Sequence, residues 1–389
     1  MQPDPPQSEI ANRQSQILLR ATFLGTSWTW CIGMFLPVLL VRDYGLWGWI
    51  VFSVPNVIGA AAMGWVMRRV DDPNRFYLRH LFACTAFSLV TIAFHLFFMF
   101  WIIARLLPGG AIVCLVAAAI IFMIGVQSGG ISGGDIPAAV AVFVISLVAW
   151  AIFAMYGWTW PLTTEPARNM TELIYLAPVC VFGFALCPYL DRTFQLAYRA
   201  SGPSSSRIAF GVGFGVIFLL MILFTLCYAR RLAAAGESAD FDTIGAAAWA
   251  IGIHMALQSA FTIAAHLRPT TRVFVPLLAA AVLAAAIYGI AALVTGGAAS
   301  RSIGETAYRV FMGFYGLVFP TYVLICMIPL NTEPTRRQMS SFAVAVLLAL
   351  PLFWIGFIEQ RTVWLLPGLL IIVTAKVVAM RRPETAKVA

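Results

Sequence analysis

Four polar side chains lie close together, at positions 254–262, within one strongly apolar stretch of the chain, residues 242–266. Ser259 and Thr262 are three residues apart, and His254, Gln258 and Thr262 follow one another at intervals of four. Residues three or four apart lie on one face of a helix, and polar groups at membrane depth usually face the bundle interior or a cavity. The spacing therefore predicts a polar stripe that either lines a path for a solute or joins helices by hydrogen bonds.

The hydroxyl pair of this stripe has two interpretations. Hard cations prefer oxygen ligands, so Ser259 and Thr262 are candidates for a cation site. Ser and Thr in apolar helices also commonly bond the carbonyl four residues earlier, which would give the pair a structural role only.

Two other apolar stretches contain residues that break helices. Residues 16–41 contain Gly25-Thr26-Ser27-Trp28, and residues 172–200 contain the segment from Gly183 to Pro188. Backbone without helical hydrogen bonds is tolerated at membrane depth only where it is buried in protein or lines a cavity. We therefore expect both segments to depart from helical geometry beside a solute site.

Single side chains near the breaks refine the predicted site. Trp28 offers a broad aromatic wall for an amine or a ring, and Tyr315, in the stretch 306–330, either gates the site or packs in the interior. Asp191 either carries a proton, because a poorly hydrated carboxylate holds protons more tightly, or begins a second half-helix, whose dipole favours an acidic residue. His95, among phenylalanines, is expected to be packed and hydrogen-bonded. The predicted solute-binding residues are Gly25, Thr26, Ser27, Trp28, Gly183, Phe184, His254, Gln258 and Tyr315.

The elements that must position these residues are membrane helices. Of the 389 residues, 61% are hydrophobic and 11% are charged, and the mean hydropathy is +0.89. Soluble domains carry roughly 25% charged residues, so we expect an all-α polytopic membrane protein whose surroundings are the lipid bilayer. No stretch is polar enough for a sizeable extramembrane domain, which excludes soluble catalysis and a nucleic-acid partner, and we expect no enzyme activity.

Apolar runs of roughly 18–25 residues predict about twelve spanning helices. The runs lie at 16–41, 45–67, 80–104, 109–127, 136–157, 172–200, 207–229, 242–266, 273–296, 306–330, 338–358 and 362–380. They divide the chain into a tail (1–15), a first five-helix unit (16–157), a second five-helix unit (172–330), two additional helices (338–380) and a second tail (381–389). An odd number of helices in the first unit would place the second unit inverted in the membrane.

The net charge of +9 indicates topology rather than a charged partner. Lys and Arg are retained on the cytoplasmic side of short loops, and twelve spans with a cytoplasmic N-terminus would place about two thirds of these residues inside. We therefore expect both termini in the cytoplasm and a location in a bacterial cytoplasmic (inner) membrane. The seven cysteines lie in apolar stretches and show no disulfide or metal-site spacing.

At the two breaks and the hydroxyl pair, the chain resembles the leucine-transporter fold of the amino acid–polyamine–organocation superfamily, most closely its divergent sodium:solute symporters. The resemblance depends on the order of spans, on the Gly25-Thr26-Ser27-Trp28 break, on the Gly/Pro break before Asp191, and on Ser259 and Thr262. It implies a 5+5 inverted repeat with a small-molecule site between the broken first helices of the two units.

The resemblance also implies a sodium site. Its ligands would be the carbonyls of Thr22, Phe23 and Gly25 and the hydroxyls of Ser259 and Thr262. Na+ would be the coupling ion, and the resemblance implies no other metal and no cofactor.

The function implied by the resemblance is secondary active transport of a small organic solute by alternating access, coupled to sodium. Two alternatives stay open: a proton-coupled carrier of the same fold, and a non-transporting membrane sensor or scaffold that keeps the fold. The segment Gly130-Ile131-Ser132-Gly133 matches the serine motif of rhomboid-type intramembrane proteases. Such a serine needs a hydrogen-bonded base to act as a nucleophile. A chain of about twelve spans also has more helices than members of that family, so we do not favour the protease interpretation.

Overall fold

The structure is a computed structural model in which all regular structure of the described residues is helical. The described residues are 7–128, 134–156, 166–238, 241–267, 274–295, 303–328 and 330–380. The tail predicted at 381–389 and the Gly130-to-Gly133 motif lie outside them. The tail predicted at 1–15 is partly helical, because α1 begins at Gln7.

The long helices carry the fold, and short 3-10 and π-helical segments continue several of them. The α-helices are α1 (Gln7–Trp28), α2 (Cys31–Val66), α3 (Pro73–Arg79), α4 (Leu81–Phe98), α5 (Ala104–Leu106), α6 (Gly110–Gln127), α7 (Ile136–Met155), α8 (Met170–Leu186), α9 (Arg192–Arg199), α10 (Pro203–Val212), α11 (Leu219–Ser238), α12 (Ala247–Leu267), α13 (Phe274–Thr295), α14 (Ile303–Gly313), α15 (Phe319–Tyr322), α16 (Arg336–Phe353) and α17 (Leu365–Met380). The other segments are η1 (Met67–Arg69), η2 (Met99–Ile103), η5 (Cys187–Leu190), η6 (Gly213–Phe218), η7 (Phe241–Ile244), η8 (Phe314–Val318), η9 (Val323–Met327), η10 (Trp354–Ile358) and η11 (Thr362–Trp364).

Eleven helical segments of the described chain are long and apolar enough to cross a membrane, so the protein is a multi-pass integral membrane protein. The prediction of about twelve spans differs from this number at the N-terminus. The first half of α1 carries Gln, Ser, Asn and Arg side chains, which make it less apolar than a spanning helix, and Cys31–Arg69 forms one segment of 39 residues.

The long segment is not one straight helix, because α2 turns sharply at Gly45. This glycine has φ 62° and ψ −150°, a conformation that side chains disfavour. The turn brings Gly48 so close to Leu40 that a Cβ atom on Gly48 would collide with the Leu40 carbonyl oxygen. The turn falls at the boundary between the first two predicted spans, 16–41 and 45–67.

Both predicted helix breaks exist, each slightly later in the chain than expected. The first lies at Thr29-Trp30, between α1 and α2, instead of at Gly25 to Trp28. In the second, α8 passes into the 3-10 segment η5, and extended Asp191 (ψ 117°) separates η5 from α9.

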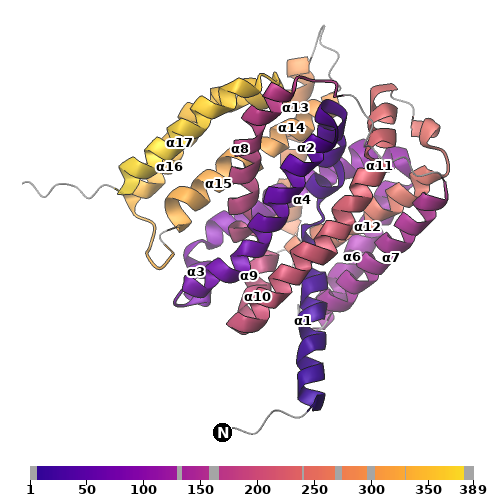
Figure 1. The fold of residues 1–389 in the computed structure, drawn as a ribbon, viewed down its shortest axis with the longest axis horizontal. Helices are drawn as coiled ribbons and strands as arrows, with labels where there is room; N and C mark the ends of the chain where they lie inside the picture. Colours follow the sequence, from indigo (N-terminus) through magenta and orange to yellow (C-terminus); the bar gives the residue numbers. More distant parts are fainter. Residues whose placement is uncertain are drawn as a thin grey trace, which may run out of the picture.

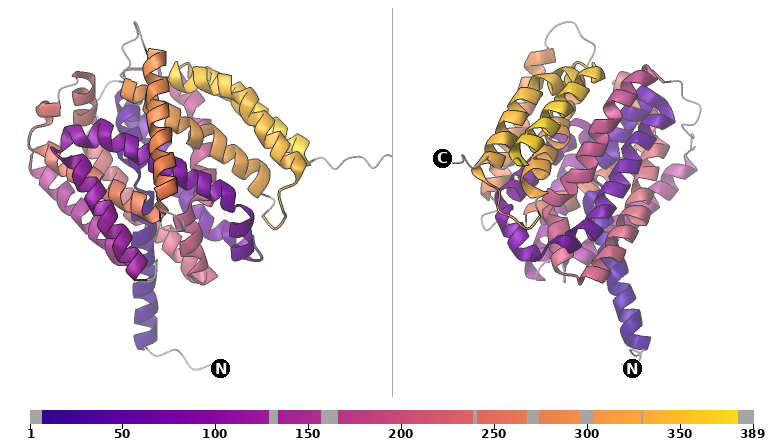
Figure 2. Two further views of the ribbon diagram at one scale, coloured as in Figure 1. Left: turned by 180° about the vertical axis from the view of Figure 1, so that it is seen from behind. Right: turned by 60° about the vertical axis from the view of Figure 1, so that its left-hand side comes forward.

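The helices form one bundle (Figure 1), in which α12 is the most buried of the candidate spanning helices. The apolar window of α12 is 83% buried within the protein, whereas those of α13 and α17 are 22% buried and cover the outside. α12 packs against α6, α7 and α4, and α2 packs against α8 and α11. The first half of α1 projects from one end of the bundle, and α16 and α17 pack side by side on its flank (Figure 2).

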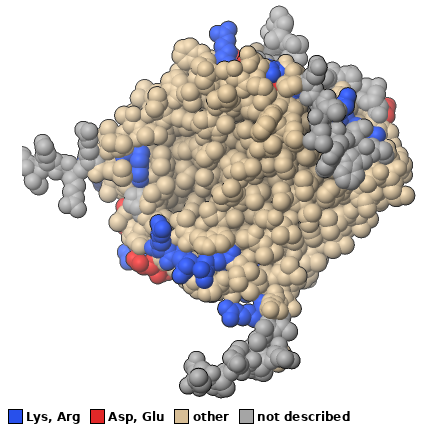
Figure 3. All heavy atoms as spheres, in the orientation of Figure 1, with Lys and Arg blue, Asp and Glu red and all other residues tan. Residues whose placement is uncertain are grey.

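Charged residues gather at two ends of the bundle. At one end Arg79 Nε lies 3.1 Å from Glu333 Oε1, and Arg199 donates to Asn74. Arginine side chains line the corresponding lower edge in Figure 3, and most of the surface above this edge is uncharged. At the other end Arg168 pairs with Asp43, and about 20 residues of α2, or about 30 Å of helix, separate that end from the first.

These positions predict opposite exposure of two loops. Asp71 and Ala167 are exposed and lie in the loops before α3 and before α8, and all seven native cysteines are buried. We expect a membrane-impermeant maleimide to label Ala167→Cys in right-side-out vesicles and Asp71→Cys only in inside-out vesicles. Labelling of both variants from the same side would contradict this topology, and the unaltered chain provides the background.

Candidate functional site

Hydrogen bonds to all four terminal carbonyls of α1 hold the first break. A helix end leaves four carbonyls without helical partners, and each unsatisfied group costs several kcal/mol in hydrocarbon. Thr29 donates from Oγ1 to the Gly25 carbonyl (2.9 Å) and from its backbone N–H to the Thr26 carbonyl (3.2 Å). Trp30 donates from its ring Nε1 and its backbone N–H to the next two carbonyls. Thr29 and Trp30 therefore close this helix end without any ligand.

The start of α2 is held from two other helices. The backbone N–H of Cys31 donates to His95 Nε2 (3.2 Å), and His95 Nδ1 lies 2.7 Å from the Thr91 carbonyl oxygen. Thr91 Oγ1 lies 2.9 Å from the hydroxyl of Tyr315. Tyr308 donates from its hydroxyl to the Cys31 carbonyl (3.1 Å). His95 is thus a packed, hydrogen-bonded histidine, as the sequence predicts.

The second break meets the first through one threonine. Asp191 caps α9, because its Oδ1 accepts from the backbone N–H of Thr193 (2.7 Å) and lies 2.6 Å from Thr193 Oγ1. Thr193 Oγ1 also lies 3.2 Å from Ser27 Oγ in α1. The prediction that Asp191 begins a second half-helix is confirmed, and the two interrupted helices are within hydrogen-bond distance of each other.

A small cavity lies at this junction. Its volume of about 10 Å³ is close to what one water molecule needs. Its lining includes four predicted solute-binding residues, Trp28, Gly183, Phe184 and Tyr315, together with Trp30, Ile32, Gly33, Asn56 and Cys187. Trp28 is fixed there because its ring Nε1 donates to Asn56 Oδ1 (2.6 Å).

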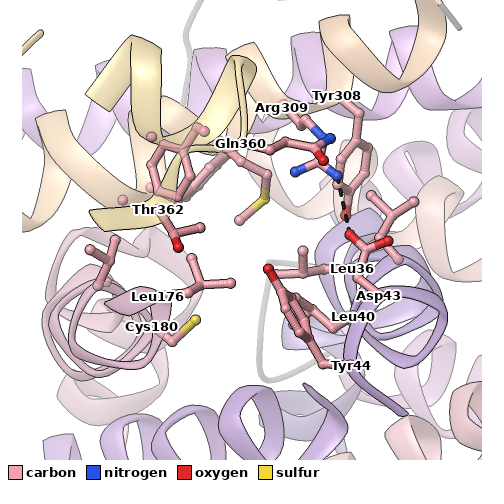
Figure 4. A pocket seen from close by; sticks show the side chains of 18 of the residues that line it. Leu36, Leu40, Asp43, Tyr44, Leu176, Cys180, Tyr308, Arg309, Gln360 and Thr362 are labelled. Carbon is pink, nitrogen blue, oxygen red and sulfur yellow. Dashed lines mark ion pairs between the residues drawn. The ribbon is translucent and has the colours of Figure 1, made fainter. Parts of the chain in front are cut away.

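A larger cavity of about 70 Å³, which we call the vestibule, adjoins the first (Figure 4). Gly183, Phe184 and Tyr315 line both cavities. The other walls of the vestibule are mainly apolar and include Leu36, Leu39, Leu40, Leu176, Val179, Cys180, Met312 and Phe357. The hydroxyls of Tyr44 and Thr362 point into this space in Figure 4.

Three arginines and three acidic residues form an ion-pair network beside the vestibule. Its members are Arg42, Asp43, Arg168, Glu172, Glu305 and Arg309. Arg42 binds both carboxylate oxygens of Glu305 (2.8 and 2.9 Å), and Arg309 lies 3.6 Å from Asp43, the pair marked in Figure 4. Asp43 and Arg309 belong to the vestibule wall. The charges of the six residues balance, so the network adds no net charge to this end of the site.

The opposite side of the junction is closed by a cap of packed aromatic and basic side chains. The guanidinium of Arg199 lies 4.1 Å from the ring centre of Tyr77, an attractive cation–π geometry. His80, just before α4, has its Nδ1 3.1 Å from the hydroxyl of Tyr322. Burial, reinforced by the charge of Arg79, lowers the pKa of His80 to about 4, so this histidine is neutral at pH 7.

The predicted residues His254 and Gln258 lie elsewhere, in a separate polar cluster. Both are fully buried and reach Ser146 of α7, at 2.9 Å from His254 Nδ1 and 3.1 Å from Gln258 Nε2. Neither lines the small cavity or the vestibule. Their bonds join α12 to α7, which is the helix-joining interpretation of the stripe.

The residues of the predicted sodium site have other partners, with one exception. The hydroxyls of Thr22 and Thr262 donate to the carbonyls four residues earlier. Gly25 packs against η6, where a Cβ atom would lie 2.7 Å from a backbone oxygen. Ser259 is buried, and its hydroxyl has no hydrogen-bond partner among the described residues.

The other predicted residues of α1 serve packing or bonding within and between helices. Phe23 packs edge-to-face against Phe261 of α12 at 5.9 Å between ring centres. Thr26 donates to the Ala139 carbonyl of α7 (3.4 Å), and Ser27 donates to the Leu24 carbonyl (3.1 Å). Because α1 remains helical to Trp28, the carbonyls of Thr22 and Phe23 lie inside a continuous helix.

Sequence reasoning missed two parts of this region. His266 continues the four-residue spacing of the polar stripe, and its Nε2 lies 3.9 Å from Asp191 Oδ2. The ion-pair network had a signal in the charged residues Arg42, Asp43 and Glu305 within otherwise apolar stretches. Their partners come from distant parts of the chain, which a single sequence does not reveal.

Within the described residues no group of three or more His, Cys, Asp or Glu side chains is placed to hold a metal ion. Comparison with models of known protein families, with curated proteins and with solved structures finds no match for this chain. The features of the molecule that bear on function are therefore the two breaks, the two cavities and the charged residues around them.

The first break predicts a marked cost for removing one hydroxyl. Thr29→Val leaves the Gly25 carbonyl without a donor, because the backbone N–H of Thr29 bonds a different carbonyl. We expect this variant to lose about 1–3 kcal/mol of stability, seen as a lower midpoint of thermal unfolding in detergent. Thr22→Val is the matched control, since its hydroxyl also bonds a carbonyl four residues earlier, in an unbroken helix. Equal losses in both variants would contradict this role of Thr29.

Proposed function

We propose that the protein is a secondary transporter that moves a small organic solute across the membrane by alternating access. The observation that carries the proposal is the meeting of two interrupted helices, α1–α2 and α8–α9, at a cavity. Interrupted membrane helices that meet near a cavity are the typical place of solute binding in transporters of this kind. In support, the hydroxyl oxygens of Thr193 and Ser27, one beside each break, lie in contact at 3.2 Å.

We propose further that residues 16–157 and 172–330 are the two inverted five-helix units of a leucine-transporter-like fold. Each unit would then begin with a broken helix, α1–α2 in the first and α8–α9 in the second. The close packing of Gly183 supports a movable junction there. A Cβ atom on this glycine would lie 2.7 Å from the Tyr315 carbonyl oxygen, so the backbones of α8 and η8 are in direct contact here. A small shift of one helix against the other would therefore change the shape of the cavity.

The two sides of the junction differ in a way that suits alternating access. On one side the vestibule extends from Phe184 and Tyr315 toward the ion-pair network. On the other side the cap around Tyr77 and Arg199 fills the space. We propose that the structure represents the state in which the solute path is closed on the side of the cap around Tyr77 and Arg199. On the side of the vestibule the path is incompletely closed.

The lining of the vestibule indicates the class of solute. The walls are mainly aliphatic and aromatic, and the polar groups include the neutral hydroxyls of Tyr44 and Thr362, the neutral amide of Gln360 and two members of the charge-balanced ion-pair network, Asp43 and Arg309. Moving a net charge into such surroundings is costly unless it is paired. We therefore propose an uncharged or zwitterionic solute with an apolar body.

Sodium coupling stays a prediction within this proposal. Only the unpartnered hydroxyl of Ser259, among the described residues of the predicted site, is free to take a new partner without breaking a bond. Sodium coupling through Ser259 and Thr262 predicts that the double replacement Ser259→Ala/Thr262→Ala removes the sodium dependence of solute binding. Trp28→Ala should instead weaken solute binding and leave the sodium response unchanged, because the two roles use different atoms. A titration of each variant across sodium concentrations separates the two effects, and an unchanged sodium response in the double variant would exclude this ion site.

Transport itself can be tested through a native cysteine. Cys180 of α8 lines the vestibule. A library of amino acids, amines, nucleobases and sugars would first be screened for compounds that raise the thermal midpoint, and uptake of each such compound would be measured in proteoliposomes. We expect a small methanethiosulfonate reagent to block uptake by the unaltered protein and the solute to protect against it.

The matched control is Cys180→Ala, which should transport and resist the reagent. Absence of uptake for every stabilising compound would overturn the proposed function. Equal inhibition of Cys180→Ala would show that the vestibule is not the solute path.

A further inference from the structure

A buried acid and a buried histidine face each other beside the second break. Asp191 and His266 are both fully buried, and Asp191 Oδ2 lies 3.9 Å from His266 Nε2. Neither atom has a hydrogen-bond partner among the described residues. The other polar atoms of both side chains are bonded: Asp191 Oδ1 to Thr193, and His266 Nδ1 to Ser88 Oγ at 2.9 Å.

The separation of 3.9 Å is too long for a hydrogen bond, whose N···O distance is about 2.7–3.2 Å. An oxygen of an ionised carboxylate that is buried without a partner is strongly disfavoured. When the ring hydrogen of His266 is on Nδ1 and is donated to Ser88, neither facing atom carries a hydrogen. One added proton shared between His266 Nε2 and Asp191 Oδ2 then supplies the missing donor, and a movement of only about 1 Å brings the two atoms to hydrogen-bond distance. The pair is therefore built to take up one proton and to shorten when it does.

The surroundings oppose permanent protonation. The N-terminus of α9 and two hydrogen bonds from Thr193 favour the carboxylate of Asp191, while burial opposes its charge. The titratable groups acting on the pair from neighbouring elements are Arg192 on α9, Cys84 and His95 on α4, and Tyr315 in η8. Trp30 faces His266 edge-on at 5.7 Å and contributes no charge. Effects that favour the charged form of Asp191 and effects that oppose it thus act at the same place, as reversible binding of a proton requires.

We propose that Asp191 and His266 form a proton-binding site, and that the proton bound there is the coupling ion of this protein. The coupling role depends on the proposed transport function, whereas the proton site itself does not. Shortening of the Asp191–His266 contact pulls α9 toward α12. Thr193 transmits this movement, because it is bonded to Asp191 and lies 3.2 Å from Ser27 at the end of α1. Proton uptake thus acts on both broken helices at once, and solute and proton affinities become linked.

The proton site can be tested with protons alone, on the full chain in lipid nanodiscs without any solute. Infrared difference spectroscopy between about pH 8 and pH 6 detects protonated carboxyl groups, and exposed aspartates stay ionised there because their ordinary pKa is about 3.9. We expect a protonated-carboxyl band in the unaltered protein and its loss in Asp191→Asn. Asparagine keeps the cap of α9, so this variant should fold. Asp71→Asn, in an exposed loop, is the matched control and should keep the band.

The histidine is tested by a variant that keeps its ring packing. His266→Phe preserves an aromatic ring against Trp30 but removes the nitrogen, so the carboxyl band should shift to another frequency as its hydrogen bond is lost. An identical band in His266→Phe, or no band that Asp191→Asn removes, would overturn the proton site.

The coupling role is read in proteoliposomes with a solute taken from the thermal screen and a pH-sensitive dye inside. We expect inward proton movement with solute uptake in the unaltered protein. Asp191→Asn should lose accumulation driven by a pH gradient and keep solute exchange at equal pH. Solute accumulation driven by sodium without proton movement would overturn the coupling role alone, whereas the carboxyl band without any solute flux would overturn the proposed transport function.

Discussion

The requirement that every backbone polar group be hydrogen-bonded inside a membrane governs this structure. A break in a spanning helix is possible only if other donors and acceptors replace the lost helical bonds. Thr29 and Trp30 supply those donors at the end of α1, and His95 and Tyr308 hold the start of α2. The aromatic and polar residues around the small cavity therefore have a structural task first, and any solute site depends on their completing it.

Close backbone packing explains why the junction is narrow. Gly183 meets the Tyr315 carbonyl, and Gly25 meets the backbone of η6, at distances that leave no room for a side chain. Small residues allow membrane helices to approach in this way. The resulting cavity has room for about one water, and the aromatic rings of Trp28, Trp30, Phe184 and Tyr315 form much of its wall. A solute can enter only if these rings or the helices that carry them move.

The sequence predicted the features that depend on local chemistry. Glycine, proline and small polar residues indicated both breaks, and Asp191 indicated the start of α9, because helix breaking and capping are determined by neighbouring residues. The exact break positions were missed by a few residues, since the bonds of Thr29 and Trp30 extend α1 to Trp28. Other features depend on tertiary packing, which neighbouring residues do not determine. They are the grouping of Arg42, Asp43, Glu305 and Arg309 and the position of His266 opposite Asp191. His254 and Gln258 were placed on the correct buried stripe, but the direction of that stripe toward Ser146 follows from the position of α7.

The ion-pair network and the cap, which lie on opposite sides of the junction, are held by different kinds of interaction. Breaking an isolated buried ion pair is costly because it strands a charge. In the ion-pair network, however, Asp43 contacts both Arg168 and Arg309, and Glu305 contacts both Arg42 and Arg309. A movement of α14 can therefore exchange partners without leaving any charge alone. The cap at the other side is held differently, by uncharged partners: Arg199 stacks on the ring of Tyr77 and donates to Asn74, and His80 lies beside the hydroxyl of Tyr322. In the proposed transport cycle, opening that side would separate α9 from α3 and the start of α4 from α15. Asp191 caps α9 and is bonded to Thr193, which lies 3.2 Å from Ser27 at the end of α1, so the proposed protonation of Asp191 would act on α9 directly.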